Sequence, residues 1–293
     1  DLGTGAFSSR SMDDVISTAL VTIRRAPSDE HACAVQAAPL ADLRRDAGKP
    51  LRRTTALLCQ ESVYEFDPKS FEVIAGQPIV YFWTQEFLDQ YAKAPKLGQV
   101  SPARATQGLY SNTRFTRWWH EVDRSRVSSA PTRASPWTPF ANGSNGASWF
   151  EPLRLVALWG DGGTEAKSHV SVKVRADLFR FANEQFFFRD DGVAFSMIGA
   201  RFGARHVGFR GTFGDKGRCV FPESVAQCVC LMNSTKARFM MESINPSISF
   251  QAGDVNRLAV IQIPDAEAVF ATVCEAASLH EASREPSIKF KLP

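Results

Sequence analysis

Apolar residues recur at helical spacing in three parts of the chain, and these parts predict its main helices. They are residues 81–94, 222–245 and 265–285. In the first, YFWTQEFLDQYAKA, the periodic pattern stops before Pro95. The second divides into two helical pieces, because Asn233 and Ser234 can cap a new helix. The third predicts a final amphipathic helix.

Runs rich in β-branched and aromatic residues predict strands between these helices. They are residues 15–23, 71–80, 153–160 and 259–264, the second interrupted by glycine and proline. Residues 186–198 predict a hairpin, in which FFF and VAFSMI flank the turn Asp190-Asp191-Gly192. Residues 136–150 contain two Asn-Gly pairs and predict a long loop. The DGGTEAK segment predicts a turn with an exposed Lys167.

The polar pattern divides the chain near Asp67-Pro68. Residues 28–66 are poor in apolar residues and contain the charged run DLRRDAGKPLRR, which is typical of a connecting region. Helices and strands then mix without an internal repeat. This mixture indicates an α+β fold with a mixed or antiparallel sheet.

The charge, the cysteines and the apolar runs limit which kinds of binding site we expect in this chain. The 293 residues carry a net charge of +3, so any site for a polyanion must be a local patch. Six scattered cysteines favour a reduced, cytoplasmic protein, and the Cys228-x-Cys230 spacing is not that of a zinc site, so we expect no metal. No apolar run is long enough to cross a membrane. The start at DLGTGAF, without Met, leads us to expect a fragment or a trimmed chain.

The first basic patch lies in residues 108–122, GLYSNTRFTRWWHEV. It interleaves Arg114 and Arg117 with aromatic rings, among them Trp118, and includes the amide Asn112. Cations between flat rings suit a ligand with phosphates and stackable bases, and Arg and Asn can also pair with base edges. The alternative is a helix end with aromatic residues in a core and arginines in water. The local pattern does not separate the two.

The second basic patch lies in residues 199–218, where six glycines alternate with cations. Arg201, Arg205 and Arg210 stand between glycines that let a backbone approach a ligand closely. The alternative is a set of bulged strands with solvated arginines. Both interpretations stay open.

Known catalytic patterns are missing from the sequence. It has no GxSxG, Walker or HExxH motif, and His120 and Glu121 are neighbours that face different directions on a helix. The opening DLGTG could cradle S-adenosylmethionine, but no strand precedes it, so a plain turn is preferred. Methylation of the adenine amino group needs an Asn/Asp-Pro-Pro-aromatic loop, and no Pro-Pro pair exists. We predict no catalytic or cofactor-binding residue.

Five motifs, in order, carry a resemblance to a known family. They are FEVIAGQPIVYFW, SNTRFTRWWHEV, WTPFANGSNGASWF with LRLVALWGDGGTEAK, VAFSMIGARFGARHVG, and LMNSTKARFMMESINPSISFQAGDVNRLAVIQIP. The chain resembles the C-terminal part of PglX-type adenine-specific DNA methyltransferases of BREX-like phage-defence systems, and related type IIG enzymes. The last motif is also similar to the end of target-recognition domains in type I specificity subunits.

The resemblance implies a division of the chain into three parts. Residues 1–66 would be the tail of an α/β methyltransferase domain and a connector, residues 67–265 a DNA target-recognition domain, and residues 266–293 a C-terminal helix and tail. The family methylates adenine with S-adenosylmethionine. Because the cofactor turn and the catalytic loop are missing here, no cofactor is expected for this chain alone.

The resemblance also implies partners and sites. The partners are double-stranded DNA, an upstream methyltransferase domain and other defence-system subunits, without a membrane. Asn245, Pro246, Phe250 and Gly253 would shape a turn. The residues expected to contact DNA are Asn112, Arg114, Arg117, Trp118, Lys167, Arg201, Arg205 and Arg210.

Two other functions remain open at this stage. The chain could be a protein-interaction or scaffold module of a defence complex, which would bind partner subunits and no DNA. It could also be a small stand-alone methyltransferase that uses residues 1–5 for its cofactor, which calorimetry with S-adenosylmethionine would detect.

Overall fold

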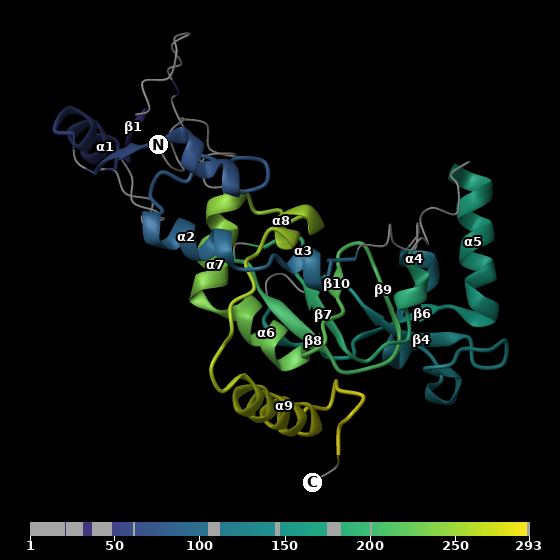
Figure 1. Cartoon of the computed structure of the whole chain (residues 1–293). Helices are drawn as coiled ribbons and strands as arrows, with labels where there is room; N and C mark the ends of the chain where they lie inside the picture. The colour runs from purple at the N-terminus through teal and green to yellow at the C-terminus, as the bar shows by residue number, and fades with distance from the viewer. Residues whose placement is uncertain are drawn as a thin grey trace. The chain divides into compact units, whose positions relative to one another are not determined.

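The computed structural model describes residues 21, 32–36, 49–60, 62–104, 112–143, 147–174, 183–199 and 201–291 (Figure 1). The strand predicted over residues 15–23 and the DLGTG turn lie outside the described residues, apart from Val21. The chain forms two compact units. The first is Asp1–Ala94 with Glu242–Ile248, and the second is Pro95–Met241 with Ser249–Pro293. The predicted boundary near Asp67 stays a prediction.

The first unit combines a two-stranded antiparallel sheet with short helices. Its elements are β1 (Ala32–Val35), α1 (Lys49–Leu58), β2 (Val63–Phe66), the 3-10 helix η1 (Pro68–Val73) and α2 (Gln85–Lys93). The predicted helix over residues 81–94 is confirmed by α2, whose N-cap Thr84 Oγ1 accepts the Phe87 N–H at 3.2 Å. The described part of residues 28–66 contains β1, α1 and β2, and the interpretation of this stretch as a connecting region stays a prediction.

Aromatic rings hold this unit together. Tyr64 and Tyr81 lie with ring centroids 5.1 Å apart, and Phe66 and Phe71 lie 5.4 Å apart. The contacts link β2 to the segment before α2. Aromatic packing therefore contributes to the core of this small unit, together with buried aliphatic residues such as Ile74 and Val80. The extended segment predicted over 71–80 is wrong at its start, where η1 runs to Val73.

Two four-stranded sheets form the second unit. The order of the first is β3 (Thr116–Trp118), β6 (Leu155–Leu158), β4 (Trp137–Ala141), β9 (Thr212–Phe213). The order of the second is β10 (Cys219–Val220), β7 (Gly192–Phe195), β8 (Ala204–Val207), β5 (Trp149–Phe150). Pairs β4–β9 and β5–β8 are parallel and the others antiparallel. The mixed α+β class is confirmed; no preceding methyltransferase domain is shown.

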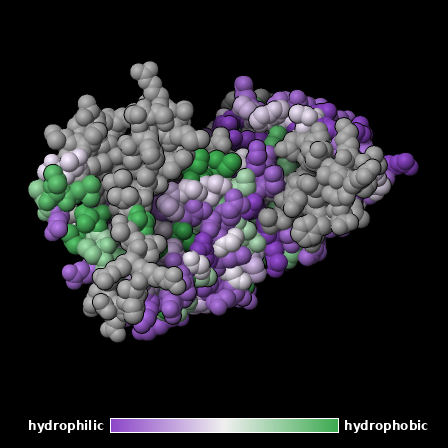
Figure 2. Space-filling model, turned by 90° about the horizontal axis from the view of Figure 1, so that it is seen from above, coloured by the Kyte–Doolittle hydropathy of each residue, from purple (hydrophilic) through white to green (hydrophobic). Residues whose placement is uncertain are grey.

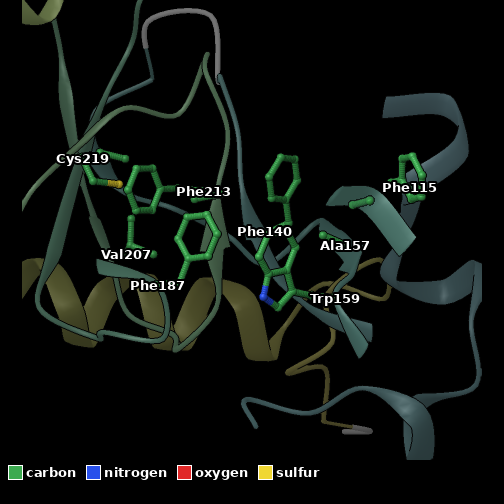
Figure 3. Close-up of a cluster of buried hydrophobic side chains, with 11 residues drawn as sticks. Phe115, Phe140, Ala157, Trp159, Phe187, Val207, Phe213 and Cys219 are labelled. Atoms are coloured by element: carbon green, nitrogen blue, oxygen red, sulfur yellow. The ribbon is translucent and has the colours of Figure 1, made fainter. Parts of the chain in front are cut away.

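A cluster of buried rings joins the two sheets (Figure 3). Phe187 meets Phe213 and Trp159 edge-on, with both pairs of centroids 5.2 Å apart. Phe140 of β4 and Cys219 of β10 belong to the same cluster. Its members come from both sheets, so the burial of their apolar area stabilises the packing of one sheet against the other.

Seven helices are described in or entering this unit. They are α3 (Leu97–Val100), α4 (Asn112–Phe115), α5 (Gly160–Val174), α6 (Val225–Asn233), α7 (Thr235–Ile244), α8 (Ala252–Asn256) and α9 (Ala266–Ala282). Helix α6 packs against β8 on one side and α9 on the other (Figure 1). The predicted break at Ser234 is confirmed, because its Oγ accepts the Ala237 N–H at 3.1 Å and so caps α7. The final helix is also confirmed.

Three strand and loop predictions in this unit are wrong. Residues 184–186 form the 3-10 helix η5, and β7 pairs with β8 and β10, so the hairpin does not exist. The predicted loop over 136–150 contains β4 and β5. Residues 259–264 lie outside any named strand, although Ala259 forms an isolated bridge with Lys96. Among the described residues, none of the helices has the length and apolar content needed to cross a bilayer.

The cysteines differ sharply in exposure, which gives a test of the fold. Cys33 and Cys59 are exposed, whereas burial raises the pKa of Cys228 to about 12 and that of Cys219 further. Since the thiolate is the reactive form, iodoacetamide at neutral pH should modify Cys33 and Cys59 and spare the buried pair. Mass spectrometry of the labelled peptides measures this. Labelling in urea is the control, and labelling of Cys228 at the rate of Cys59 in the folded chain would contradict the structure.

Candidate nucleic-acid interface

The first basic patch lies where α4 runs directly into β3, the edge strand of its sheet. Phe115 anchors the junction, because its side chain is fully buried and its ring meets the His169 ring at 5.3 Å. Strand β3 pairs with β6, with Arg117 opposite Val156. Side chains alternate along a strand, so Arg117 and Trp118 point to opposite faces. Buried Phe115 and exposed Arg114 match the interpretation of aromatic residues in a core and arginines in water, and the contact with nucleic acid stays a prediction.

Arg114 is exposed and faces the helix α5. Its guanidinium lies 3.2 Å from Glu165 Oε1 and 3.2 Å from His169 Nδ1. About half of each side chain of the ion pair is exposed, 53% for Arg114 and 57% for Glu165. An ion pair this open to water stabilises the fold by only about 0–1 kcal/mol. The guanidinium can therefore exchange partners at little cost.

Arg117 has a different environment. Its Nη1 donates to the backbone oxygens of Thr113 and Thr116, each at 2.7 Å, and so satisfies carbonyls at the end of α4. The guanidinium carbon also lies 6.0 Å from the centre of the Trp137 ring. These contacts fix the side chain, and within the described ranges Arg117 forms no ion pair with a carboxylate. The arrangement presents a positioned cation.

Lys167 lies on α5 and not in the exposed turn that was predicted. Its Nζ is 2.6 Å from Glu184 Oε2 and 5.6 Å from the centre of the Trp159 ring, and only 28% of its side chain is exposed. The turn itself comprises Asp161 to Gly163, all with positive φ. Its last residue packs so closely on Trp159 that a Cβ would lie 2.8 Å from the ring.

Arg205 is fully buried, and its guanidinium is satisfied on three sides. Its Nε donates to the Glu151 carboxylate, Nη1 to Ser196 Oγ at 2.9 Å, and Nη2 to the Asn142 carbonyl at 3.2 Å. Burial raises the pKa of the Glu151 carboxyl, and the nearby Arg205 charge opposes that shift. A side chain enclosed in this way holds strands together. We therefore give Arg205 a structural role and leave it out of the interface.

The rest of the second patch divides between the two ends of β8. Arg201 is exposed before the strand, and Arg210 follows it, with its Nε 3.0 Å from Asp190 Oδ2. The four-residue strand itself spans about 10 Å. The structure thus brings Arg114, Arg117, Trp118 and Lys167 onto neighbouring elements, and it keeps Arg201 and Arg210 apart. Asn112 begins α4, and its side chain lies outside the described set.

The sequence did not indicate the ring contacts of His120 and His169. His120 stacks on Trp118, two residues before it, and this short spacing was a usable signal. His169 contacts Arg114, which lies 55 residues away in the chain. Of the residues expected to shape a turn, Asn245 forms one, whereas Gly253 lies inside the helix α8. Asn245 Oδ1 accepts from Ser247 N at 3.0 Å, and Phe250 is buried. Within the described ranges, no three His, Cys, Asp or Glu residues gather where a metal ion could bind.

Comparison with known proteins confirms the family resemblance. The chain is 26% identical over 206 residues to "Adenine-specific methyltransferase PglX" of Lacticaseibacillus casei (strain Zhang), a match that covers 67% of this chain and 17% of the relative. It is 28% identical over 200 residues to "Adenine-specific methyltransferase BrxX" of Escherichia coli O9:H4 (strain HS), covering 66% and 16%. The chain spans roughly a sixth of the length of these relatives. No protein-family model matches it.

Proposed function

We propose that this chain supplies DNA recognition to an adenine-specific methyltransferase of phage defence. In this proposal it holds double-stranded DNA on the surface formed by α4, β3 and α5, while another part of the methyltransferase transfers the methyl group from S-adenosylmethionine. We assign that cofactor to no residue of this chain. The observation that carries the proposal is that Arg114 and Trp118 are exposed, and Arg117 is partly exposed, on one continuous segment anchored by buried Phe115.

Two ion pairs of the predicted DNA-contacting cations are open enough to exchange with DNA. Glu165 pairs with Arg114 on the surface formed by α4, β3 and α5, and Asp190 pairs with Arg210 in the second basic patch; the side chains of both pairs are more than half exposed. The Lys167–Glu184 pair is less exposed. A phosphate, like a carboxylate, can accept two parallel hydrogen bonds from the Arg guanidinium. Release of counterions from the duplex favours the exchange. The carboxylates therefore act as competitors that lower non-specific affinity.

Removing one cation or its competitor should change DNA affinity in opposite directions. Arg114→Ala should weaken duplex binding about 5- to 10-fold and lower the slope of log K against log salt by about 0.9, because one phosphate contact is lost. Glu165→Gln should strengthen binding about two- to five-fold, since it frees the same guanidinium. Fluorescence anisotropy with a labelled duplex across a salt series measures both.

The controls separate this site from general charge effects. Lys236→Ala removes an exposed cation at the start of α7 and should leave affinity and slope close to those of the unmodified chain. Arg201→Ala tests the second patch independently. If Arg114→Ala behaves like Lys236→Ala, the site assignment is wrong.

A second candidate function is a docking module of a defence complex, favoured by one observation. The first unit exposes apolar side chains, with Leu58 80% and Ile79 61% exposed. Figure 2 shows apolar residues gathered at the left-hand end, where α1 lies in Figure 1. Recovery of partner subunits together with a failure to bind any duplex would favour this function over DNA recognition.

A further inference from the structure

Three consecutive residues after Arg117 form an aromatic stack at the edge of the sheet. The Trp118 and His120 rings are nearly parallel, with centroids 6.2 Å apart and an interplanar angle of 16°. The Trp119 ring meets His120 edge-on, with centroids 5.8 Å apart. Half of Trp118 remains exposed, so solvent can reach the ring at this end of the stack.

Hydrogen bonds fix this stack before any ligand arrives. Trp119 Nε1 donates to the Pro286 carbonyl at 2.9 Å, and its backbone N–H donates to the Arg154 carbonyl at 2.9 Å. The Trp118 backbone N–H donates to Glu121 Oε2 at 2.7 Å, which closes the short 3-10 helix η2 (Trp119–Glu121). These bonds fix the Trp119 ring and the backbone of Trp118, and the Trp118 ring itself is positioned by its contact with His120. A ring that is already positioned loses less side-chain entropy when it binds a planar partner.

The charges around the stack suit a nucleotide. Arg124 and Arg126 are exposed in the 3-10 helix η3 (Arg124–Arg126), which follows η2 in the chain, whereas Arg117 points to the opposite face of β3 and is not part of this arrangement. Glu121 and Asp123 lie in the same segment, but each is engaged by backbone N–H groups, those of Trp118 and Ser125. A flat ring beside guanidinium groups is the arrangement with which proteins bind an unstacked base and its phosphates.

We propose that Trp118, backed by His120, is a stacking platform for a nucleobase that has left the double helix. A base paired within a duplex presents only its edges, and an indole face can stack on it only after the base turns outward. The interface would thus prefer DNA with an unpaired base to a perfect duplex. This inference rests on the proposed function and specifies the form of DNA that the site binds.

The test compares two DNA ligands that differ in one base. The full chain is titrated with a short, fully paired duplex and with the same duplex carrying one bulged 2-aminopurine. Base–aromatic stacking predicts about 5- to 100-fold tighter binding of the bulged DNA, with a change in 2-aminopurine fluorescence. Trp118→Ala should abolish that preference and leave the salt slope unchanged, because stacking releases no counterions.

Matched variants make the result specific. Trp118→Phe keeps a ring and should keep most of the preference, whereas Ile198→Ala removes another exposed apolar side chain and should change nothing. Equal binding of the two DNAs, or a preference that survives Trp118→Ala, would overturn the platform and leave the proposed function standing. Failure of the unmodified chain to bind either DNA would overturn both.

Discussion

Replacement of Arg205 by methionine should lower the free energy of unfolding by about 3–5 kcal/mol. The substitution leaves the Glu151 carboxylate buried beside β8 without its cation, and it removes the donors to Ser196 Oγ and the Asn142 carbonyl. These acceptors belong to segments adjoining β5, β7 and β4, so the loss affects both sheets. Urea denaturation followed by circular dichroism measures the change.

Two companion variants identify the cause of that loss. Combining Arg205→Met with Glu151→Leu removes both charges and should recover most of the lost stability, because an apolar pair needs no compensation. Arg201→Ala, on an exposed arginine four residues earlier, should change stability by less than about 0.5 kcal/mol. A loss below about 1 kcal/mol in Arg205→Met would show that the buried pair does not hold the sheets.

Replacement of Gly211 by alanine should be the other severe change, with a loss of about 3 kcal/mol or more. A Cβ at this position would overlap the carbonyl oxygen of Pro139 and lie 2.7 Å from its carbonyl carbon. Because backbone atoms cannot rotate away as a side chain can, β9 would have to move away from β4. Thermal unfolding and the yield of folded protein both report this.

Gly253 is the matched control. Nothing lies within 4 Å of a Cβ added there, and the residue is inside α8. Gly253→Ala should therefore be neutral or stabilise by up to about 1 kcal/mol. If the two alanine variants unfold at the same temperature, close approach of β9 to Pro139 is not what requires Gly211.

The sequence allowed the helices to be predicted better than the sheets, for a physical reason. The pattern of α2, α6, α7 and α9 is set by residues three and four apart, together with caps such as Ser234, all of which are local. Strand β4 contains Pro139 in the middle of a sheet, where proline is rare, and its neighbours β6 and β9 come from distant segments. Phe187 was predicted to lie in a strand because it is apolar, but it follows the 3-10 helix η5 and its side chain is buried in the core.

The sequence predicted the residues of the candidate site only where the residues that act together are close in the chain. Arg117 and Trp118 are adjacent in the sequence, so a local motif was enough to find both. The partner of Arg114 is 51 residues away, and the burial of Arg205 depends on Glu151, 54 residues away. A single sequence shows a basic residue in each case, but it does not show which carboxylate compensates the charge.

The three left-handed residues Asp161–Gly163 have a consequence for how this surface can vary. They link β6 to the regular part of α5 and so set the rotation of the helix about its own axis. That rotation places Glu165 and His169 toward Arg114. One inserted residue would rotate every later side chain of the helix by about 100° and bring a different row toward α4. The length of this single tight turn thus decides which row of α5 side chains faces Arg114, without a change to any strand of the sheet.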